Sequence, residues 1–212
     1  MDIVLPQAQA YAEKYTSPED ELLHEVAQYT YTQHDHSNML SGHLQGAFLT
    51  MISRMIKSKR ILEIGTFTGY SALCLAKGLT AGGQLHTVEL REDDAAIAQA
   101  YFRRSSYAPQ LILHIGNATK IVGELDEEWD LVFIDADKEN YTAYFNLIFP
   151  RVKSGGFILA DNVLFHGQVL EPEIKGKSAK GIQAFNDAVA GRNDVERLLL
   201  PLRDGIMMMR KL

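Results

Sequence analysis

The stretch W-D-L-V-F-I-D-A-D-K, residues 129–138, decides the fold of this chain. It begins with a largely apolar run of the length of a buried strand, and an acidic residue, Asp135, follows directly. A second stretch, F-I-L-A-D-N at residues 157–162, ends in the same way with Asp161 and Asn162. Polar side chains just past buried parallel strands gather in the crevice where open α/β sheets bind ligands. We therefore predict an α/β protein with a site around these three residues.

Strand and helix patterns alternate around these two stretches. Strands are predicted at 61–64, 84–89, 111–115, 129–134 and 157–159, and helices at 71–77, 93–105 and 141–149, with a shorter helical piece near Thr119. Such alternation predicts a doubly wound, mostly parallel sheet. Residues 195–200 and 206–210 flank the turn R-D-G at 203–205, which predicts two more strands and an antiparallel C-terminal edge. The expected sheet therefore has seven strands.

The first part of the chain has a different pattern. Residues 1–57 are predicted to form an N-terminal helical segment and residues 58–212 a core, within one domain overall. Ser17-Pro18-Glu19-Asp20 provides a cap, a proline for the first turn and acids for the positive end of the helix dipole, which predicts a helix start. A further helix is predicted at 44–57 from recurring apolar positions.

Composition excludes several classes of protein. The 212 residues carry a formal net charge of −6, which argues against a nucleic-acid-binding surface. No apolar stretch approaches the roughly 20 residues that span a bilayer, and the first residues, M-D-I-V-L-P-Q-A, do not resemble a secretory signal. The single cysteine, Cys74, rules out an intramolecular disulfide. We therefore expect a cytoplasmic protein without membrane partners.

The three polar residues after the two strands suggest a metal site. Asp135, Asp161 and Asn162 supply hard oxygen ligands that suit Mg²⁺ best, with Mn²⁺ or Ca²⁺ as alternatives, and leave positions for water and substrate. A second group, His34, Asp35, His36 and His43, could resemble another metal cluster, but its spacing favours a polar lid.

The stretch E-I-G-T-F-T-G-Y-S, residues 63–71, suggests a cofactor without phosphates. Its glycines permit a tight turn after a strand, but Phe67 stands where a dinucleotide fingerprint needs glycine. Glu63 would repel phosphate and attract an ammonium group. Glu89, at the end of the next predicted strand, is placed to accept hydrogen bonds from ribose hydroxyls. A ribose and an amino acid without phosphate describe S-adenosylmethionine.

These motifs together resemble those of the cation-dependent class I O-methyltransferases, the family of caffeoyl-CoA and catechol O-methyltransferases. The matching stretches run in family order from about residue 20 onward and are Q-G-A-F-L (45–49), E-I-G-T-F-T-G-Y-S (63–71), F-I-D-A-D-K (133–138), G-G-F-I-L-A-D-N-V-L-F-H-G (155–167) and D-G-I-M-M-M-R-K (204–211). The resemblance implies a Rossmann-like methyltransferase fold, a homodimer, and an N-terminal segment that covers the site and contributes substrate and dimer contacts.

The resemblance also implies roles for individual residues. Asp135, Asp161 and Asn162 would ligate the metal, and Lys138 with Asp135 would form the catalytic pair, Lys138 as candidate general base. The implied cofactor-binding residues are Met39, Ser41, Glu63, Gly65, Thr66, Ser71, Glu89, Ala118 and Asp135.

The resulting hypothesis is methyl transfer from S-adenosylmethionine to one hydroxyl of a vicinal aromatic diol, whose oxygens the metal binds and orients. Three alternatives stay open. They are a nicotinamide-dependent oxidoreductase, which Phe67 disfavours, a metal-dependent phosphoesterase, for which no phosphate-cradling loop is found, and a non-catalytic cofactor-binding module. The acceptor itself is open, with Phe165 and His166 as candidate residues at its mouth.

Overall fold

A seven-stranded sheet runs through residues 3–212, the part of the chain that the structure, a computed structural model, describes. Its strand order is β3-β2-β1-β4-β5-β7-β6, with β7 antiparallel to both β5 and β6 and the remaining neighbours parallel. The predicted sheet is thereby confirmed. The strands are β1 (Arg60–Ile64), β2 (Gln84–Glu89), β3 (Leu111–Ile115), β4 (Trp129–Ile134), β5 (Val152–Ala160), β6 (Val195–Leu200) and β7 (Ile206–Lys211).

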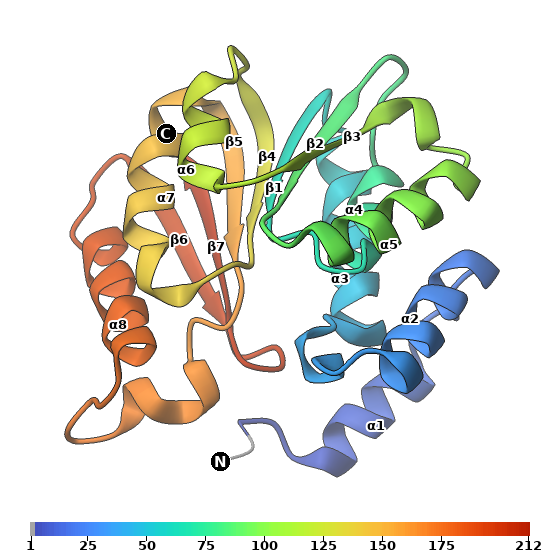
Figure 1. Ribbon diagram of the computed structural model, residues 1–212. Coiled ribbons are helices and arrows are strands. Elements are labelled where there is room, and N and C mark those ends of the chain that lie inside the picture. Colours follow the sequence, from blue (N-terminus) through green and yellow to red (C-terminus); the bar gives the residue numbers. More distant parts are fainter. Residues whose placement is uncertain (1–2) are drawn as a thin grey trace.

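Helices cover both faces of the sheet, with α6, α7 and α8 on one side and α3, α4 and α5 on the other (Figure 1). Within residues 3–212, no helix combines the length and the apolar character that crossing a membrane requires. The α-helices are α1 (Pro6–Lys14), α2 (Glu21–Gln33), α3 (Gly42–Ile56), α4 (Tyr70–Ala76), α5 (Glu92–Arg104), α6 (Ala118–Glu124), α7 (Tyr141–Ile148) and α8 (Lys177–Ala190). The short 3-10 helices are η1 (Ser37–Met39), η2 (Ala108–Gln110), η3 (Lys138–Asn140), η4 (Phe149–Arg151) and η5 (Phe165–Leu170).

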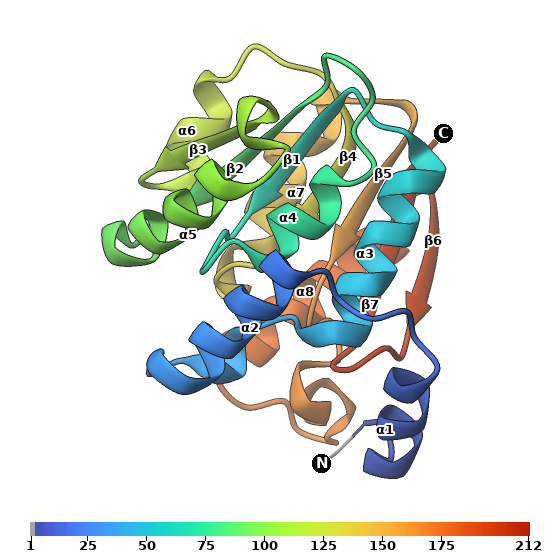
Figure 2. The ribbon, with the colours of Figure 1, turned by 90° about the vertical axis from the view of Figure 1, so that its right-hand side faces the viewer.

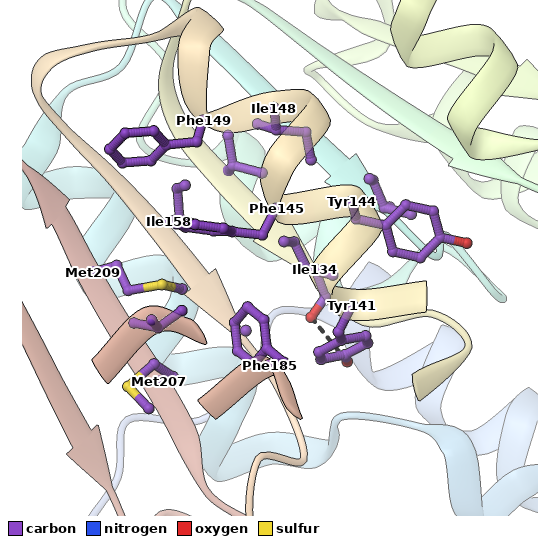
Figure 3. Packing of buried hydrophobic residues seen from close by; sticks show 14 of the residues in the cluster. Ile134, Tyr141, Tyr144, Phe145, Ile148, Phe149, Ile158, Phe185, Met207 and Met209 are labelled. Atoms are coloured by element: carbon purple, nitrogen blue, oxygen red, sulfur yellow. Dashed lines mark hydrogen bonds between the residues drawn. The ribbon is translucent and has the colours of Figure 1, made fainter. Parts of the chain in front are cut away.

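The core on the α7 side is rich in aromatic side chains. Figure 3 shows Tyr141 and Phe145 of α7 beside Phe185 of α8, with Met207 and Met209 of β7 next to them. The Tyr141 and Phe185 rings meet edge to face with centroids 5.5 Å apart, a favourable aromatic geometry. The two methionines are therefore ordinary core residues of the last strand, and α7 is held firmly behind the ends of β4 and β5.

The N-terminal helices share the core on the opposite face. Figure 2 shows α3 lying along the sheet beside α4. Leu23 and Val26 of α2 and Leu49 of α3 are buried in the same cluster as Ile61 of β1. Burial of each such side chain contributes about 1.5–3 kcal/mol to the stability of the fold. These apolar contacts therefore hold the N-terminal helices against the sheet.

The beginning of α2 differs from the prediction. Ser17 was the expected cap, but α2 begins after Asp20, whose Oδ1 accepts a hydrogen bond of 3.0 Å from the Leu23 amide. The neighbouring residue Glu19 accepts a hydrogen bond from the Tyr70 hydroxyl of α4. The segment before Asp20 therefore contacts α4 instead of extending the helix.

Two further elements were predicted incorrectly. Strand β5 begins at Val152, ahead of the predicted start at residue 157, and Gly155 lies inside it with φ +79° beside an irregularity in the pairing with β4. Helix α8 was not predicted, although Ala179, Ile182, Phe185 and Val189 form its buried face at helical spacing. Its polar first turn and Gly181 obscured that pattern.

Candidate functional site

A cavity of about 580 Å³ opens at the carboxyl ends of the parallel strands. Its wall combines the loops after β1, β2, β4 and β5 with η1 and the turn between β6 and β7. This is the crevice in which open α/β sheets bind ligands. The predicted site residues in its wall are Met39, Ser41, Gly65, Thr66, Ser71, Glu89, Ala118, Asp135, Lys138, Asp161 and Asn162.

The loop after β1 lies tight against the end of β4. Gly65 has φ +99°, and a Cβ built on it would stand 1.9 Å from the carbonyl oxygen of Asp135. Phe67 adopts φ +51°, which is uncommon for a residue with a side chain. Its amide donates a hydrogen bond of 2.7 Å to Oε2 of Glu89. Glycine at 65 thus allows the first loop and Asp135 to share one wall.

Glu89 is held by the backbone around it. Oε1 accepts hydrogen bonds of 3.0 Å from the amides of both Leu90 and Arg91, while Oε2 accepts the one from Phe67. An ionised carboxylate has about four acceptor positions, so three backbone donors leave room for a further donor from the cavity. The geometry therefore suits a hydroxyl-bearing ligand such as a ribose.

Glu63 lies behind the cavity wall rather than in it. Its side chain is fully buried, and Oε2 accepts a hydrogen bond of 2.5 Å from the Thr87 hydroxyl. Burial raises the pKa of Glu63 to about 8, and the hydrogen bonds from Ser71 and Thr87 only partly oppose that rise. Among the described residues, Oε1 has no hydrogen-bond partner. Glu63 can thus act on a ligand through Ser71, which does line the cavity.

The three predicted metal ligands all line the cavity. Strand β5 ends at Ala160, and Asn162 adopts φ +56°, so the backbone has left the strand before Asn162. Burial raises the pKa of Asp161, and the negative charge of Asp135 raises it further. Two close carboxylates and an amide oxygen form a hard donor set whose mutual repulsion a divalent cation would relieve. These residues therefore fit the metal that the sequence implies.

Lys138 is an ion-pair partner of Asp135. Its Nζ lies 2.8 Å from Asp135 Oδ1 and 2.9 Å from the Tyr141 hydroxyl oxygen. Burial lowers the pKa of Lys138, but Asp135, Tyr141 and Asp161 outweigh burial and raise the pKa above its ordinary value. This direction is opposite to the lowered pKa that favours a general base. The base role of Lys138 stays a prediction, whereas its position beside Asp135 is observed.

The histidines of the N-terminal segment do not form a metal cluster. His34 Nε2 lies 2.8 Å from Asp94 Oδ1, and His43 Nε2 lies 2.8 Å from the Ser17 carbonyl oxygen. Within residues 3–212, no three His, Cys, Asp or Glu side chains are arranged to hold a metal ion. Phe165 and His166, in contrast, do line the cavity, as expected for the acceptor mouth.

Gln45 and Arg203 are two residues at the site that the sequence did not reveal. Gln45 is buried and donates a hydrogen bond of 2.7 Å from Nε2 to Asp161 Oδ2. Arg203 lines the cavity from the turn before β7 and donates from Nη1 to the Ser41 carbonyl. Both were interpreted only as parts of a matching stretch and of a turn. No local signal marks a contact between residues so far apart in sequence.

Comparison with known proteins decides the family. The family model described as O-methyltransferase matches residues 13–212. The chain belongs to this O-methyltransferase family. Membership favours methyl transfer over the oxidoreductase, phosphoesterase and non-catalytic alternatives.

Individual relatives agree with this assignment. A catechol O-methyltransferase of Niastella koreensis is 35% identical to this O-methyltransferase over 162 residues, which cover 74% of this chain and 73% of the relative. A probable caffeoyl-CoA O-methyltransferase of Dictyostelium discoideum is 29% identical over 95% of this chain and 90% of its own. The crystal structure of a Podospora anserina methyltransferase with bound S-adenosylhomocysteine superimposes with a TM-score of 0.91 at 27% identity, covering 99% of this chain and 98% of that one.

Proposed function

We propose that this O-methyltransferase transfers the methyl group of S-adenosylmethionine to one hydroxyl of a catechol-like vicinal aromatic diol, with the help of a divalent cation. One observation carries the proposal: Asp135, Asp161 and Asn162 share a cavity with Glu89 and the loop after β1. A donor set for a hard cation thus lies beside a place for a ribose. The S-adenosylhomocysteine in the Podospora relative and the names of the curated relatives support the same combination.

The cofactor would lie across the ends of β1 and β2. Glu89 would accept from its ribose hydroxyls, and Ala118 would lie beside its adenine. Met39, Ser41, Gly65, Thr66 and Ser71 would surround its methionine end, and a bound ammonium group would favour the ionised form of Glu63, which lies behind this wall. These contacts would position the cofactor for methyl transfer, and positioning of this kind can supply about 7–11 kcal/mol of the barrier reduction.

The acceptor would lie on the side of Asp161, Phe165 and His166. A divalent cation held by Asp135, Asp161 and Asn162, with Mg²⁺ first and Mn²⁺ or Ca²⁺ as alternatives, would lower the pKa of the diol hydroxyls and orient them. Lys138, as the ammonium partner of Asp135, would keep that carboxylate in place. It would take the phenolic proton only after losing its own, and otherwise solvent would take it. Phe165 offers an apolar wall for the aromatic ring.

The N-terminal helical segment, residues 1–57, would cover this site and contribute substrate and dimer contacts. The exposed side chains of Met51 and Met55, 60% and 72% accessible and one turn apart on α3, support a homodimer contact there. Light scattering on the purified protein, compared with a Met51→Lys/Met55→Lys variant, would measure the oligomeric state.

Metal dependence tests the proposal. We expect EDTA to abolish methyl transfer and Mg²⁺ or Mn²⁺ to restore it. Asp161→Ala should remove nearly all activity yet leave the affinity for S-adenosylhomocysteine nearly unchanged, because the cofactor lies on the other strands. Asn162→Ala should lose less activity because both carboxylates remain. Asp187→Ala, on the exposed face of α8, is the matched control. Full activity of enzyme shown to be metal-free by elemental analysis would contradict the proposal.

The acceptor is tested by a pair of substrates. A catechol should be methylated, whereas the corresponding monophenol should react poorly because it offers one oxygen instead of two and is not oriented. Product formation is measured by chromatography at equal substrate concentration. Equal turnover of the two compounds would remove the diol from the proposal while leaving methyl transfer intact.

A further inference from the structure

A line of three side chains connects the turn before β7 with the carboxylate of Asp161. Nη1 of Arg203 donates a hydrogen bond of 3.1 Å to Oε1 of Gln45, and Nε2 of Gln45 donates one of 2.7 Å to Oδ2 of Asp161. The Gln45 side chain has no exposed surface, and Asp161 is 1% accessible. The line therefore runs through the interior, where a hydrogen bond is least weakened by competing water.

The orientation of the Gln45 amide is fixed by its two partners. Its oxygen faces a guanidinium, which can only donate, and its NH₂ group faces a carboxylate, which accepts. Rotating the amide by half a turn would oppose donor to donor and acceptor to acceptor. The NH₂ group of Gln45 is therefore held toward Asp161, because its oxygen accepts the hydrogen bond from Arg203.

Asp161 is held at both of its oxygens. Oδ2 accepts from Gln45, and Oδ1 accepts a hydrogen bond of 2.7 Å from the amide of Asn162. Because a carboxylate oxygen has two lone pairs, each oxygen keeps one for a further partner. The plane of the carboxylate is thus set before any ligand arrives.

The backbone of Arg203 adopts an uncommon conformation for a residue with a side chain. Its φ of +50° lies in the left-handed region, which glycine enters without cost and other residues enter rarely. The same guanidinium nitrogen also donates to the carbonyl oxygen of Ser41. An arginine in a glycine-like conformation is retained where its contacts outweigh the backbone preference.

We propose that Gln45 and Arg203 are positioning residues for the metal, acting through Asp161. The inference rests on the proposed metal-dependent function and names residues that hold a ligand without touching the cation. Hydrogen-bonding partners of metal ligands fix the ligand's orientation, and their loss lowers metal affinity about tenfold to a hundredfold.

Gln45→Met tests the first residue, because methionine preserves length and apolar burial but removes both hydrogen bonds. We expect the Kd for Mn²⁺, measured by electron paramagnetic resonance of the free ion, to rise at least about tenfold. The Kd for S-adenosylhomocysteine, measured by calorimetry, should stay near the wild-type value. Gln110→Met is the matched control, since Gln110 donates to Thr80 and Gly83 far from the cavity, and its Mn²⁺ affinity should not change. A folded Gln45→Met protein with wild-type Mn²⁺ affinity would overturn the inference.

Arg203→Gly separates positioning from a structural role. Glycine suits φ +50°, which offsets part of the stability lost with the Arg203 hydrogen bonds, while the Mn²⁺ affinity should fall as it does for Gln45→Met. The Mn²⁺ affinity of the double variant should be little lower than that of either single variant, because Gln45 and Arg203 act through the same chain of hydrogen bonds. A lowered melting temperature with unchanged Mn²⁺ affinity would assign Arg203 a structural role and overturn its part in the inference.

Asp161→Ala, measured in parallel, distinguishes the two proposals. If wild-type protein binds Mn²⁺ no better than Asp161→Ala, the proposed metal site fails and the inference falls with it. If wild-type protein binds Mn²⁺ through Asp161 and Gln45→Met binds it equally well, only the inference fails and the proposed function stands.

Discussion

Glu89 combines two tasks in a single carboxylate. Three backbone amides donate to it, so it orders the loop after β1 as well as the start of α5. The acceptor capacity that remains faces the cavity. If Glu89 binds the cofactor as proposed, it links the stability of the fold to the affinity for the cofactor, and both should respond to its removal.

Glu89→Ala should therefore weaken binding of S-adenosylmethionine by about 1.5–3 kcal/mol, the range for hydrogen bonds to a charged group. It should also lower the free energy of unfolding by about 1–3 kcal/mol, since buried amides lose their acceptor. Calorimetry and chemical denaturation measure the two effects. Glu196→Ala, exposed on β6, is the control and should change neither by more than about 0.5 kcal/mol. An unchanged cofactor affinity would remove Glu89 from the site.

At this scale the sequence predicted residue identity better than residue contacts. Glu89, Asp135, Asp161 and Asn162 line one cavity, and the sequence indicated that they would gather because each lies at or just past the end of a strand that can be recognised locally. Gln45 was not found, because its partner Asp161 is 116 positions away and hydrogen bonds between distant segments leave no periodic trace.

Among the elements, the loop between β1 and α4 depends most on its backbone. Gly65 lies against the carbonyl of Asp135, so the first loop and the end of β4 form one unit. The order of this part of the cavity wall and the position of Asp135 therefore depend on the absence of a side chain at residue 65.

Gly65→Ala should be severely destabilising because the new Cβ would overlap the Asp135 carbonyl at 1.9 Å in addition to the strain of φ +99°. Gly82→Ala is the matched control, with φ +69° and nothing within 4 Å of its Cβ. In the control, the free energy of unfolding should fall only by the cost of placing alanine in a left-handed backbone conformation, about 1–2 kcal/mol. In the Gly65→Ala variant, the free energy of unfolding should fall by more than about 4 kcal/mol, because the new Cβ collides with the main chain. Denaturation curves that agree for the two variants would refute this account.

Helices and strands were predictable where the periodicity of apolar residues agreed with the turn residues at their ends. The strands were recognised as apolar runs between helical patterns, and the antiparallel edge from the R-D-G turn. Helix α8 was missed because glycine and lysine occupy its first turns, and the packing of Gly181 against the Lys138 backbone is a tertiary reason that the sequence does not display. The first cap was misplaced, and the neighbouring Glu19 bonds to Tyr70, a contact made across the fold.

For the whole molecule, the buried acid Glu63 links stability to pH. Burial raises the pKa of Glu63 from 4.5 to about 8. Between these values the folded protein holds a proton that the unfolded chain releases, so the contribution of Glu63 to stability is fully present below pH 4.5 and is lost as the pH rises through about 8.

Glu63→Gln should remove the pH-dependent contribution of Glu63 to stability, because glutamine does not titrate. The wild-type free energy of unfolding should fall relative to that of the variant by at most about 1.4 kcal/mol per pH unit within the window. Chemical denaturation at several pH values across the window measures the difference, and Glu171→Gln, exposed and outside the cavity wall, serves as control. Parallel pH profiles for wild type and Glu63→Gln would show that Glu63 does not titrate in this range.

The position of β7 has a consequence for biosynthesis. This strand follows β6 in the chain yet lies between β5 and β6 in the sheet. While a ribosome has produced only the residues before Ile206, the backbone of β5 facing that gap has no partner, and β6 has nothing to pair with. Unpaired strand edges invite pairing with other chains. A nascent or prematurely terminated chain is therefore the form most exposed to aggregation and most dependent on chaperones. In the complete chain, β7 pairs with both β5 and β6 and removes these unpaired edges.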